Sequence, residues 1–106
     1  MSKKNSWPTP IPVRRALERF GNDVEAWRKL NQLTAAQVAD RAGISLPTLR
    51  SVERGEGGVS LENVFRVARA LGILDLLAGA IDPYSTDAGQ LRSDRLLPQR
   101  VRRPRG

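Results

Sequence analysis

The chain has 106 residues, with 18 Lys and Arg against 11 Asp and Glu, so its formal net charge is +7. This length suits one small domain with a modest core, which dimerisation would help to stabilise. The positive charge favours a polyanionic partner such as DNA, RNA or an anionic membrane surface. There is no cysteine and no histidine, which excludes disulfides, thiolate or imidazole metal ligands, and Ser-His-Asp or Cys-His catalysis.

The apolar segments are all short. None approaches the roughly 20 residues that a membrane span needs. The N-terminus carries two lysines but lacks the apolar core of a signal peptide. We therefore expect a cytoplasmic protein that has no membrane partner, no metal and no cofactor, and that is not an enzyme.

Residues 1–12 are expected to form a flexible, extended arm, because the prolines at positions 8, 10 and 12 cannot continue a helix hydrogen-bond ladder. Trp7 is the one aromatic side chain of this arm, and it is expected to pack on the domain surface. Between residues 13 and 30, apolar side chains recur every three or four positions, which predicts one helix. Gly21 is expected to weaken the middle of that helix.

Two short helices joined by a tight turn are predicted between residues 35 and 54. Thr34 and Gln37 fit a capping box at the start of the first helix, and Gly43 ends it. Ser45 caps the second helix, which carries Pro47 in its first turn and runs to residue 54.

Further helices are predicted beyond this pair. Ser60 caps a fourth helix that Gly72 closes, and a short, very apolar fifth helix covers residues 73–81. The domain is therefore expected at 13–82, with an Arg-rich tail at 83–106 that is disordered when free. The tail either adds nonspecific DNA affinity or docks on a partner and orders there.

The helix pair at 35–54 has a demanding arrangement of small and apolar residues. Ala39 lies where two helices would cross closely, Gly43 lies at the turn, and Leu49 and Val52 fall on the inner face of the second helix. These positions are what a helix-turn-helix requires. The alternative is an ordinary helical hairpin without a DNA role.

The pattern resembles the Xre/Cro/CI-type helix-turn-helix family over roughly residues 15–81. The segments that carry the resemblance are LTAAQVA (33–39), AGIS (42–45), TL (48–49), VERG (52–55), VSL (59–61) and VARALG (67–72). The resemblance implies an all-α, five-helix lambda-repressor-like domain that binds double-stranded DNA, with a flexible N-terminal arm and an Arg-rich C-terminal tail. It also implies that Glu53 ties the motif to a neighbouring helix.

A narrower resemblance is to the HipB-like regulators, which pair with HipA-type kinase toxins. Its cues are GGVSL (57–61), LGILDLL (71–77), DP (82–83) and LPQRVRR (97–103). One departure from the wider family is Ala35, because the family usually has a glutamine there that supports the phosphate contact and the recognition helix. This departure argues against tight sequence-specific DNA binding by the free protein.

In this fold the second motif helix enters the major groove and presents the outer face of its N-terminal part. Arg50 is expected to pair bidentately with a guanine, or alternatively to contact phosphate or solvent. Ser51 can bond several bases, Leu46 can lie against a thymine methyl, and Thr48 reaches phosphate. The predicted DNA-binding residues are Gln37, Arg41, Ser45, Leu46, Pro47, Thr48, Arg50, Ser51 and Arg54. Further bases expected to add nonspecific affinity are Lys3, Lys4, Arg28 and Lys29.

The fifth helix has more apolar surface than a small core can cover, which predicts a two-fold homodimer interface. Alternatively, the helix only caps the monomer core. The interface residues would be Ile73, Leu74, Leu76, Leu77 and Ile81. The expected function is a transcriptional repressor, acting on its own operon, and an antitoxin component that holds a HipA-like kinase toxin. The alternative is mainly a protein-interaction antitoxin module with weak DNA binding on its own.

Overall fold

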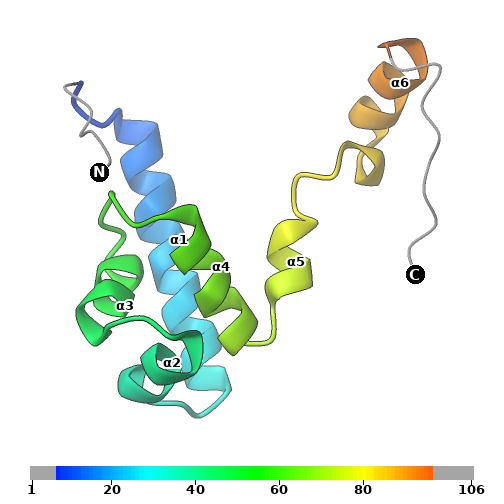
Figure 1. The fold of residues 1–106 in the computed structure, drawn as a ribbon. Coiled ribbons are helices and arrows are strands. Elements are labelled where there is room, and N and C mark those ends of the chain that lie inside the picture. The colour runs from blue at the N-terminus through cyan, green and yellow to red at the C-terminus, as the bar shows by residue number, and fades with distance from the viewer. Residues whose placement is uncertain (1–6, 97–106) are drawn as a thin grey trace.

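The computed structural model describes residues 7–96, and these residues contain helices and no strand, which confirms the predicted all-α class (Figure 1). The helices are α1 (Ile11–Leu30), α2 (Ala35–Ala42), α3 (Leu46–Glu53), α4 (Leu61–Ala70), α5 (Leu74–Ala78), the 3-10 helix η1 (Pro83–Ser85) and α6 (Asp87–Leu96). The predictions for Lys3, Lys4 and the arginines after residue 96 lie outside the described residues, as does the segment 97–103.

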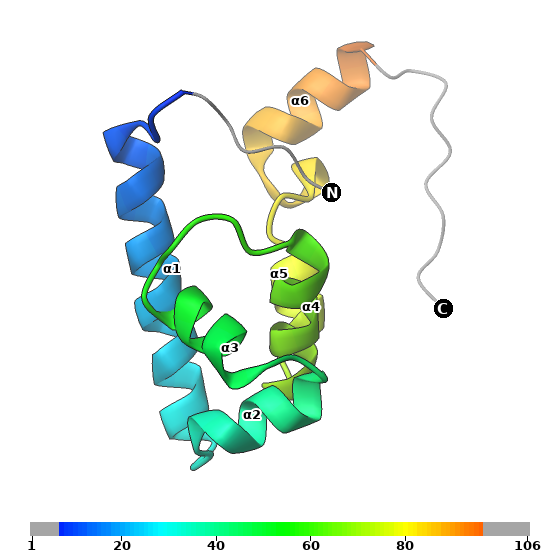
Figure 2. The ribbon, with the colours of Figure 1, turned by 60° about the vertical axis from the view of Figure 1, so that its left-hand side comes forward.

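The first four helices form a body around one small core. The long α1 runs along one side, α3 packs against it, and α2 packs against both α3 and α4 (Figure 2). Leu49 of α3, Val38 of α2 and Val67 of α4 are its largest fully buried side chains. The motif helices therefore contribute their inner faces to the core, which fixes the direction of their outer faces.

Hydroxyl caps start the three short helices of the body. The side-chain oxygens of Thr34, Ser45 and Ser60 accept the backbone N–H three residues on, at 3.1, 3.2 and 3.1 Å. Each cap satisfies an N–H group that the helix itself leaves unpaired. Gly43 ends α2 in the left-handed conformation, with φ of 70°. The predicted starts of these helices and the stop at Gly43 are confirmed.

Replacing Thr34 with alanine is expected to lower the free energy of unfolding by about 1 kcal/mol, because the N–H of Gln37 loses its acceptor. Urea denaturation followed by circular dichroism measures the change. Thr34→Ser keeps the hydroxyl and is expected to lose much less. Equal losses in the two variants would show that the cap contributes nothing.

Helix α1 begins earlier than predicted, and it continues through Gly21 as one helix, as predicted. It begins at Ile11, and Pro12 lies in its first turn, where a missing N–H does no harm. The extended arm therefore does not include residues 11 and 12. Gly21 lies within a continuous helix and is buried, because α1 passes the end of α3 there. Trp7 is 82% exposed, so it is not packed on the domain surface.

The segment after α4 also departs from the expectation. Helix α5 ends at Ala78, earlier than predicted, and residues 83–96 form η1 and α6 where a disordered tail was expected. The Asp82 carboxylate starts η1 by accepting the N–H of Tyr84 at 2.9 Å. Gly89 of α6 lies so close to the Pro83 carbonyl that no Cβ would fit between them. This contact depends on residues brought together by the turn, which the polar composition of the tail did not reveal.

Helix α6 stands away from the body. It packs on η1, and the radius of gyration of 16.7 Å exceeds the roughly 13 Å of a compact chain of this size. Figures 1 and 2 show the segment from α5 to α6 as an arm leaving the body after α4. Between residues 7 and 96, no helix is both long and apolar enough to cross a bilayer.

Candidate nucleic-acid interface

Helix α3 has an inner and an outer face. Leu49 and Val52 are buried on the inner face. The outer face carries four residues at positions i, i+3, i+4 and i+7, a spacing that places them along one side of a helix. We name these residues the reading stripe: Pro47, Arg50, Ser51 and Arg54. Three of them are exposed and Ser51 is half-buried.

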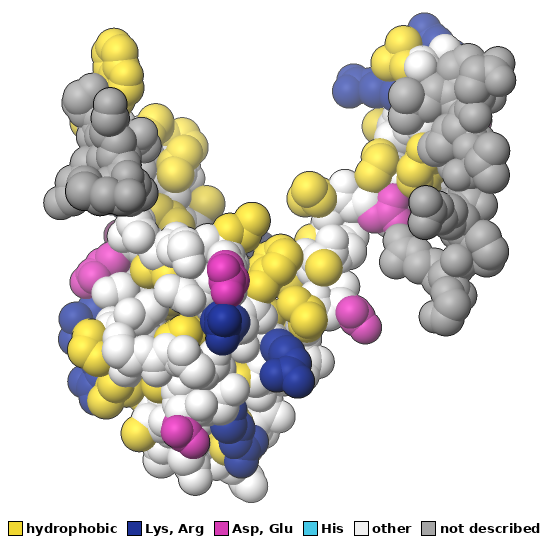
Figure 3. Space-filling view, in the orientation of Figure 1, with side chains coloured by type: hydrophobic (Ala, Val, Ile, Leu, Met, Phe, Trp, Pro, Cys, Tyr) yellow, Lys and Arg dark blue, Asp and Glu magenta, His cyan; other side chains and the backbone are white. Residues whose placement is uncertain are grey.

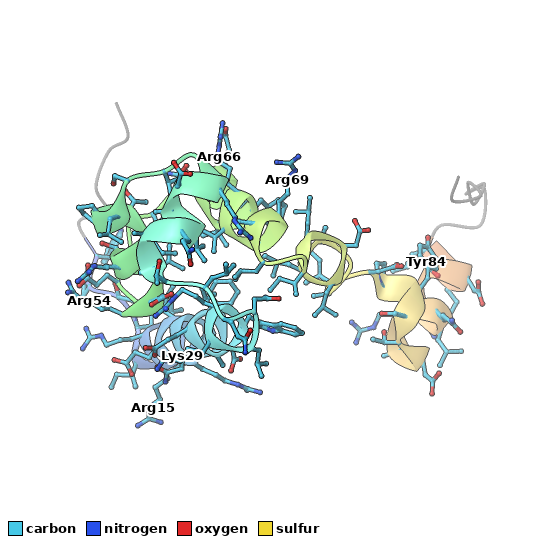
Figure 4. The ribbon with its side chains drawn as sticks, turned by 90° about the horizontal axis from the view of Figure 1, so that it is seen from below. Arg15, Lys29, Arg54, Arg66, Arg69 and Tyr84 are labelled. Carbon is cyan, nitrogen blue, oxygen red and sulfur yellow. The ribbon has the colours of Figure 1, made fainter. Side chains whose placement is uncertain are left out.

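The side chains of the reading stripe make almost no hydrogen bonds or ion pairs with other residues in the described part of the chain. Arg50 and Ser51 make no side-chain hydrogen bond or ion pair there. Arg54, which lies at the edge of the body in Figure 4, has its Nη1 3.9 Å from Glu56 Oε2, and both side chains are more than half exposed. Exposed ion pairs of this kind contribute little. The guanidinium groups therefore remain available as donors.

Two hydroxyls lie at the N-terminus of α3. Ser45 Oγ and Thr48 Oγ1 are 2.8 Å apart, and Ser45 Oγ also accepts the backbone N–H of Thr48. Backbone N–H groups and the helix dipole favour an anion at such a terminus. The arrangement suits a phosphate contact beside the reading stripe.

Three predicted DNA-binding residues have other surroundings. Leu46 is half-buried and packs against the core, because it lies one turn before Leu49, so only part of its side chain faces solvent. Gln37 Oε1 accepts the N–H of Thr34 at 2.8 Å and serves the capping box. Arg41 lines a hollow with Arg66 and other residues of α4, away from the reading stripe.

The end of α3 is tied to α1 by an ion pair with two hydrogen bonds. Arg28 donates from Nε to Glu53 Oε2 at 2.7 Å and from Nη2 to Glu53 Oε1 at 3.2 Å. Its Nη1 donates to the Leu33 carbonyl at 3.0 Å, so the turn before α2 is tied to the same guanidinium. The side chains of Arg28 and Glu53 are 14% and 11% exposed. The hydrogen bond that Arg28 donates to Glu53 raises the pKa of Arg28, so this guanidinium stays charged.

This ion pair confirms that Glu53 ties the motif to a neighbouring helix. It also corrects the inclusion of Arg28 among the phosphate-binding bases, because its donors are used inside the protein. Lys29 remains 66% exposed and forms an exposed ion pair with Glu25. Ala35, where the family usually has glutamine, lines a shallow hollow together with Arg50 and Arg54.

The residues predicted for a dimer interface divide into two groups. Ile73, Leu74 and Leu77 are half-buried, and Ile73 packs against the core. Leu76 and Ile81 are 64% and 90% exposed. The fifth helix therefore covers part of the core and also leaves apolar side chains in solvent.

Known proteins support this reading of the motif. Residues 24–77, which form more than half of the chain, match the helix-turn-helix family. The chain belongs to the Xre/Cro/CI-type helix-turn-helix family. A helix-turn-helix domain of this family implies DNA binding. The matched segment contains all of α2, α3 and α4, including the reading stripe.

This helix-turn-helix protein also resembles a curated repressor. It is 40% identical over 74 residues to the cryptic phage CTXphi transcriptional repressor RstR of Vibrio cholerae serotype O1. The aligned segment covers 69% of this chain and 60% of the length of RstR. No solved structure matches the chain significantly.

Proposed function

We propose that this protein is a sequence-specific repressor that binds double-stranded DNA and acts on its own operon, inside the compartment that holds the DNA. The observation that carries the proposal is the reading stripe. Its residues point outward from a helix whose inner face is buried and whose end is held by the Arg28–Glu53 ion pair. A helix presented in this way can enter the major groove as one rigid element. The similarity to RstR supports a repressor over other DNA-binding roles.

Within the stripe, Arg50 supplies the main sequence contact. Its guanidinium can donate to both O6 and N7 of a guanine, while the hydroxyl of Ser51 adapts to several bases. Ser45 and Thr48 at the start of α3 meet the phosphate backbone. Pro47 offers no donor, so the stripe reads few base pairs.

A narrow reading face favours binding as a homodimer, because two copies of α3 can then read half-sites about 34 Å apart. The exposed Leu76 and Ile81 support such an association. Burying them between two copies would remove apolar surface from water. We therefore propose a dimer as the form that binds the operator.

The narrower proposal of an antitoxin that pairs with a HipA-type kinase toxin rests on the sequence cues at 57–61, 71–77 and 82–83, and it stays a prediction. A mobility-shift experiment on the chain's own upstream DNA separates the two roles. Retardation by the protein alone supports the repressor. No retardation, either alone or with a co-expressed HipA-type kinase, would exclude the repressor.

Replacing Arg50 with alanine is expected to weaken binding to the upstream DNA about 5- to 100-fold, because a bidentate guanine contact is lost. Fluorescence anisotropy at fixed salt, on this DNA and on a scrambled duplex, measures the change. The loss should be much larger on the upstream DNA. Equal losses on both duplexes would identify Arg50 as a phosphate contact instead.

Arg69→Ala is the matched control for that experiment. Arg69 is an exposed arginine of α4, and Figure 4 shows it directed away from Arg54 and the reading stripe. Its replacement removes the same charge, so it corrects for the general electrostatic attraction of the protein to DNA. A loss equal to that of Arg50→Ala would contradict the assignment of the stripe.

A further inference from the structure

The core of the body is open at one end. Along the inner face of α1, Val24 is buried, Phe20 and Leu17 are half-buried, and Val13 is 49% exposed. Leu61 at the start of α4 is 68% exposed. Next to these residues is a small pocket of about 60 Å³. It is lined by Leu17 and Phe20 of α1, by Val59 before α4 and by Val64 of α4. We name the surface formed by Val13, Leu17, Leu61 and this pocket the open end of the core.

The C-terminal arm, which is the segment from α5 to α6 that leaves the body, is held by a succession of hydrogen-bonded turns. The N–H groups of Gly79, Asp82 and Ser85 donate to the carbonyls of Asp75, Gly79 and Asp82 at 2.9, 3.1 and 3.1 Å. The contact of Gly89 with the Pro83 carbonyl then fixes α6 on η1. The arm is therefore a hydrogen-bonded extension, and it holds α6 apart from α1 in both ribbon views (Figures 1 and 2).

Helix α6 lacks the packing that a short helix requires. It has 10 residues, and isolated helices shorter than about 12–15 residues are marginal in water. Among residues 7–96, η1 covers the side of α6 that carries Gly89 and Ser93, and Ser93 is 5% exposed. Leu91 points away from that side and is 65% exposed. Covering Leu91 would remove apolar surface from water.

The two uncovered surfaces are complementary in charge as well as in polarity. Asp87 and Asp94 lie at i−4 and i+3 from Leu91 and Arg95 lies at i+4, so all of them share one face of α6, on which the two aspartates leave a negative balance. Arg14 lies next to the inner face of α1 at the open end of the core. Asp87, Asp94 and Arg14 have no ion pair within residues 7–96. Figure 3 shows apolar side chains along the first turns of α1 and across the top of the body toward the arm.

We propose that α6 of one copy packs on the open end of the core of a second copy, and that the second copy returns the same contact. Leu91 would then lie against Val13 and Leu61, with the aspartates of α6 beside Arg14. In a dimer with two-fold symmetry, α6 and the open end of the core of each copy would both be covered. The segment from α5 to α6 holds α6 away from its own body. This favours a contact of α6 with a second copy over a contact within one chain. The proposal rests on the homodimer proposed above, adds a contact to the one expected at Leu76 and Ile81, and does not depend on DNA binding.

The first test is the oligomeric state of the full chain. Sedimentation equilibrium is expected to show a dimer, and Leu91→Gln is expected to raise its dissociation constant by at least about tenfold, because each dimer would bury two copies of Leu91. Arg92→Gln, on the same helix, is the matched control and should leave the constant unchanged. A monomeric full chain, or a dimer indifferent to Leu91→Gln, would overturn the proposal.

The second test locates the contact by cross-linking and uses the absence of native cysteine. Ala16→Cys protein, changed next to the inner face of α1, is mixed with Ala88→Cys protein, changed on α6, and treated with a short bismaleimide. The expected product joins two chains. Arg15→Cys, whose native side chain projects away from the body (Figure 4), replaces Ala16→Cys as the control and should give little product.

Two further outcomes are decisive. A cross-link formed within one chain of an Ala16→Cys, Ala88→Cys double variant would show that α6 folds back on its own body, which overturns the exchange. Binding of the Leu91→Gln protein to a duplex with a single half-site tests the reading stripe separately. Loss of the exchanged contact should leave that binding intact, so failure of the dimer and failure of the DNA interface give different results.

Discussion

Replacing Glu53 with alanine is expected to destabilise the folded body by about 3 kcal/mol, the range seen when one partner of a largely buried ion pair is removed. The carboxylate accepts from two nitrogens of Arg28, and both side chains are mostly shielded from water. Without Glu53, the guanidinium keeps its charge but loses the partner that compensates for its desolvation. The same change frees the C-terminal end of α3, so DNA binding should fall as well.

Urea denaturation measures this loss. Lys29→Ala is the matched control, because Lys29 forms an exposed pair with Glu25 at 3.2 Å and should cost less than about 1 kcal/mol. In the double variant Arg28→Ala, Glu53→Ala, no charge is left unpaired, so its loss should be smaller than the sum of the two single losses. Additive losses would show that the two residues do not act as a pair.

Gly21→Ala is expected to lower the free energy of unfolding by about 2–3 kcal/mol, as overpacking of a close contact does. A Cβ at this position would lie 2.5 Å from the Glu53 carbonyl oxygen and 2.6 Å from that of Val52. Both atoms belong to the backbone, so α1 and α3 would have to move apart. The displacement would also strain the neighbouring Arg28–Glu53 ion pair.

The sign of the stability change in Gly21→Ala distinguishes close packing from helix propensity. Helix propensity alone predicts that alanine in α1 is more stable than glycine by about 1 kcal/mol. Gly57→Ala is the control, because its nearest neighbour would be Leu17 Cδ1 at 3.9 Å, an ordinary contact. That variant should keep its stability in thermal unfolding. A gain of stability in Gly21→Ala would mean that α1 and α3 do not approach closely.

The starts of the short helices could be predicted because they depend on neighbouring residues. Thr34, Ser45 and Ser60 each bond to a backbone group three residues on, so the sequence contains both partners. The inner positions Leu49 and Val52 were predictable for a similar reason, since helical spacing places them on one face. The helix-turn-helix and its outward stripe could therefore be derived from local patterns.

Features that depend on distant parts of the chain could not be derived in this way. Gly21 was interpreted as a weak point because the sequence does not show that α3 passes beside it. Helix α6 has a polar composition, and its contact with η1 becomes visible only in three dimensions. The packing of Leu46 against the core was also not predicted, although its spacing of three from Leu49 indicated it.

The separation between the two faces of α3 has a consequence for how this protein can change over time. Arg50 and Ser51 take part in none of the side-chain hydrogen bonds or ion pairs described between residues 7 and 96. Under the proposed function, substitutions there are expected to alter the preferred DNA sequence while disturbing the packing of the body little. Descendants of one ancestral chain could therefore acquire different operators without first becoming less stable. The same property makes these two positions the natural ones to randomise when a new specificity is sought.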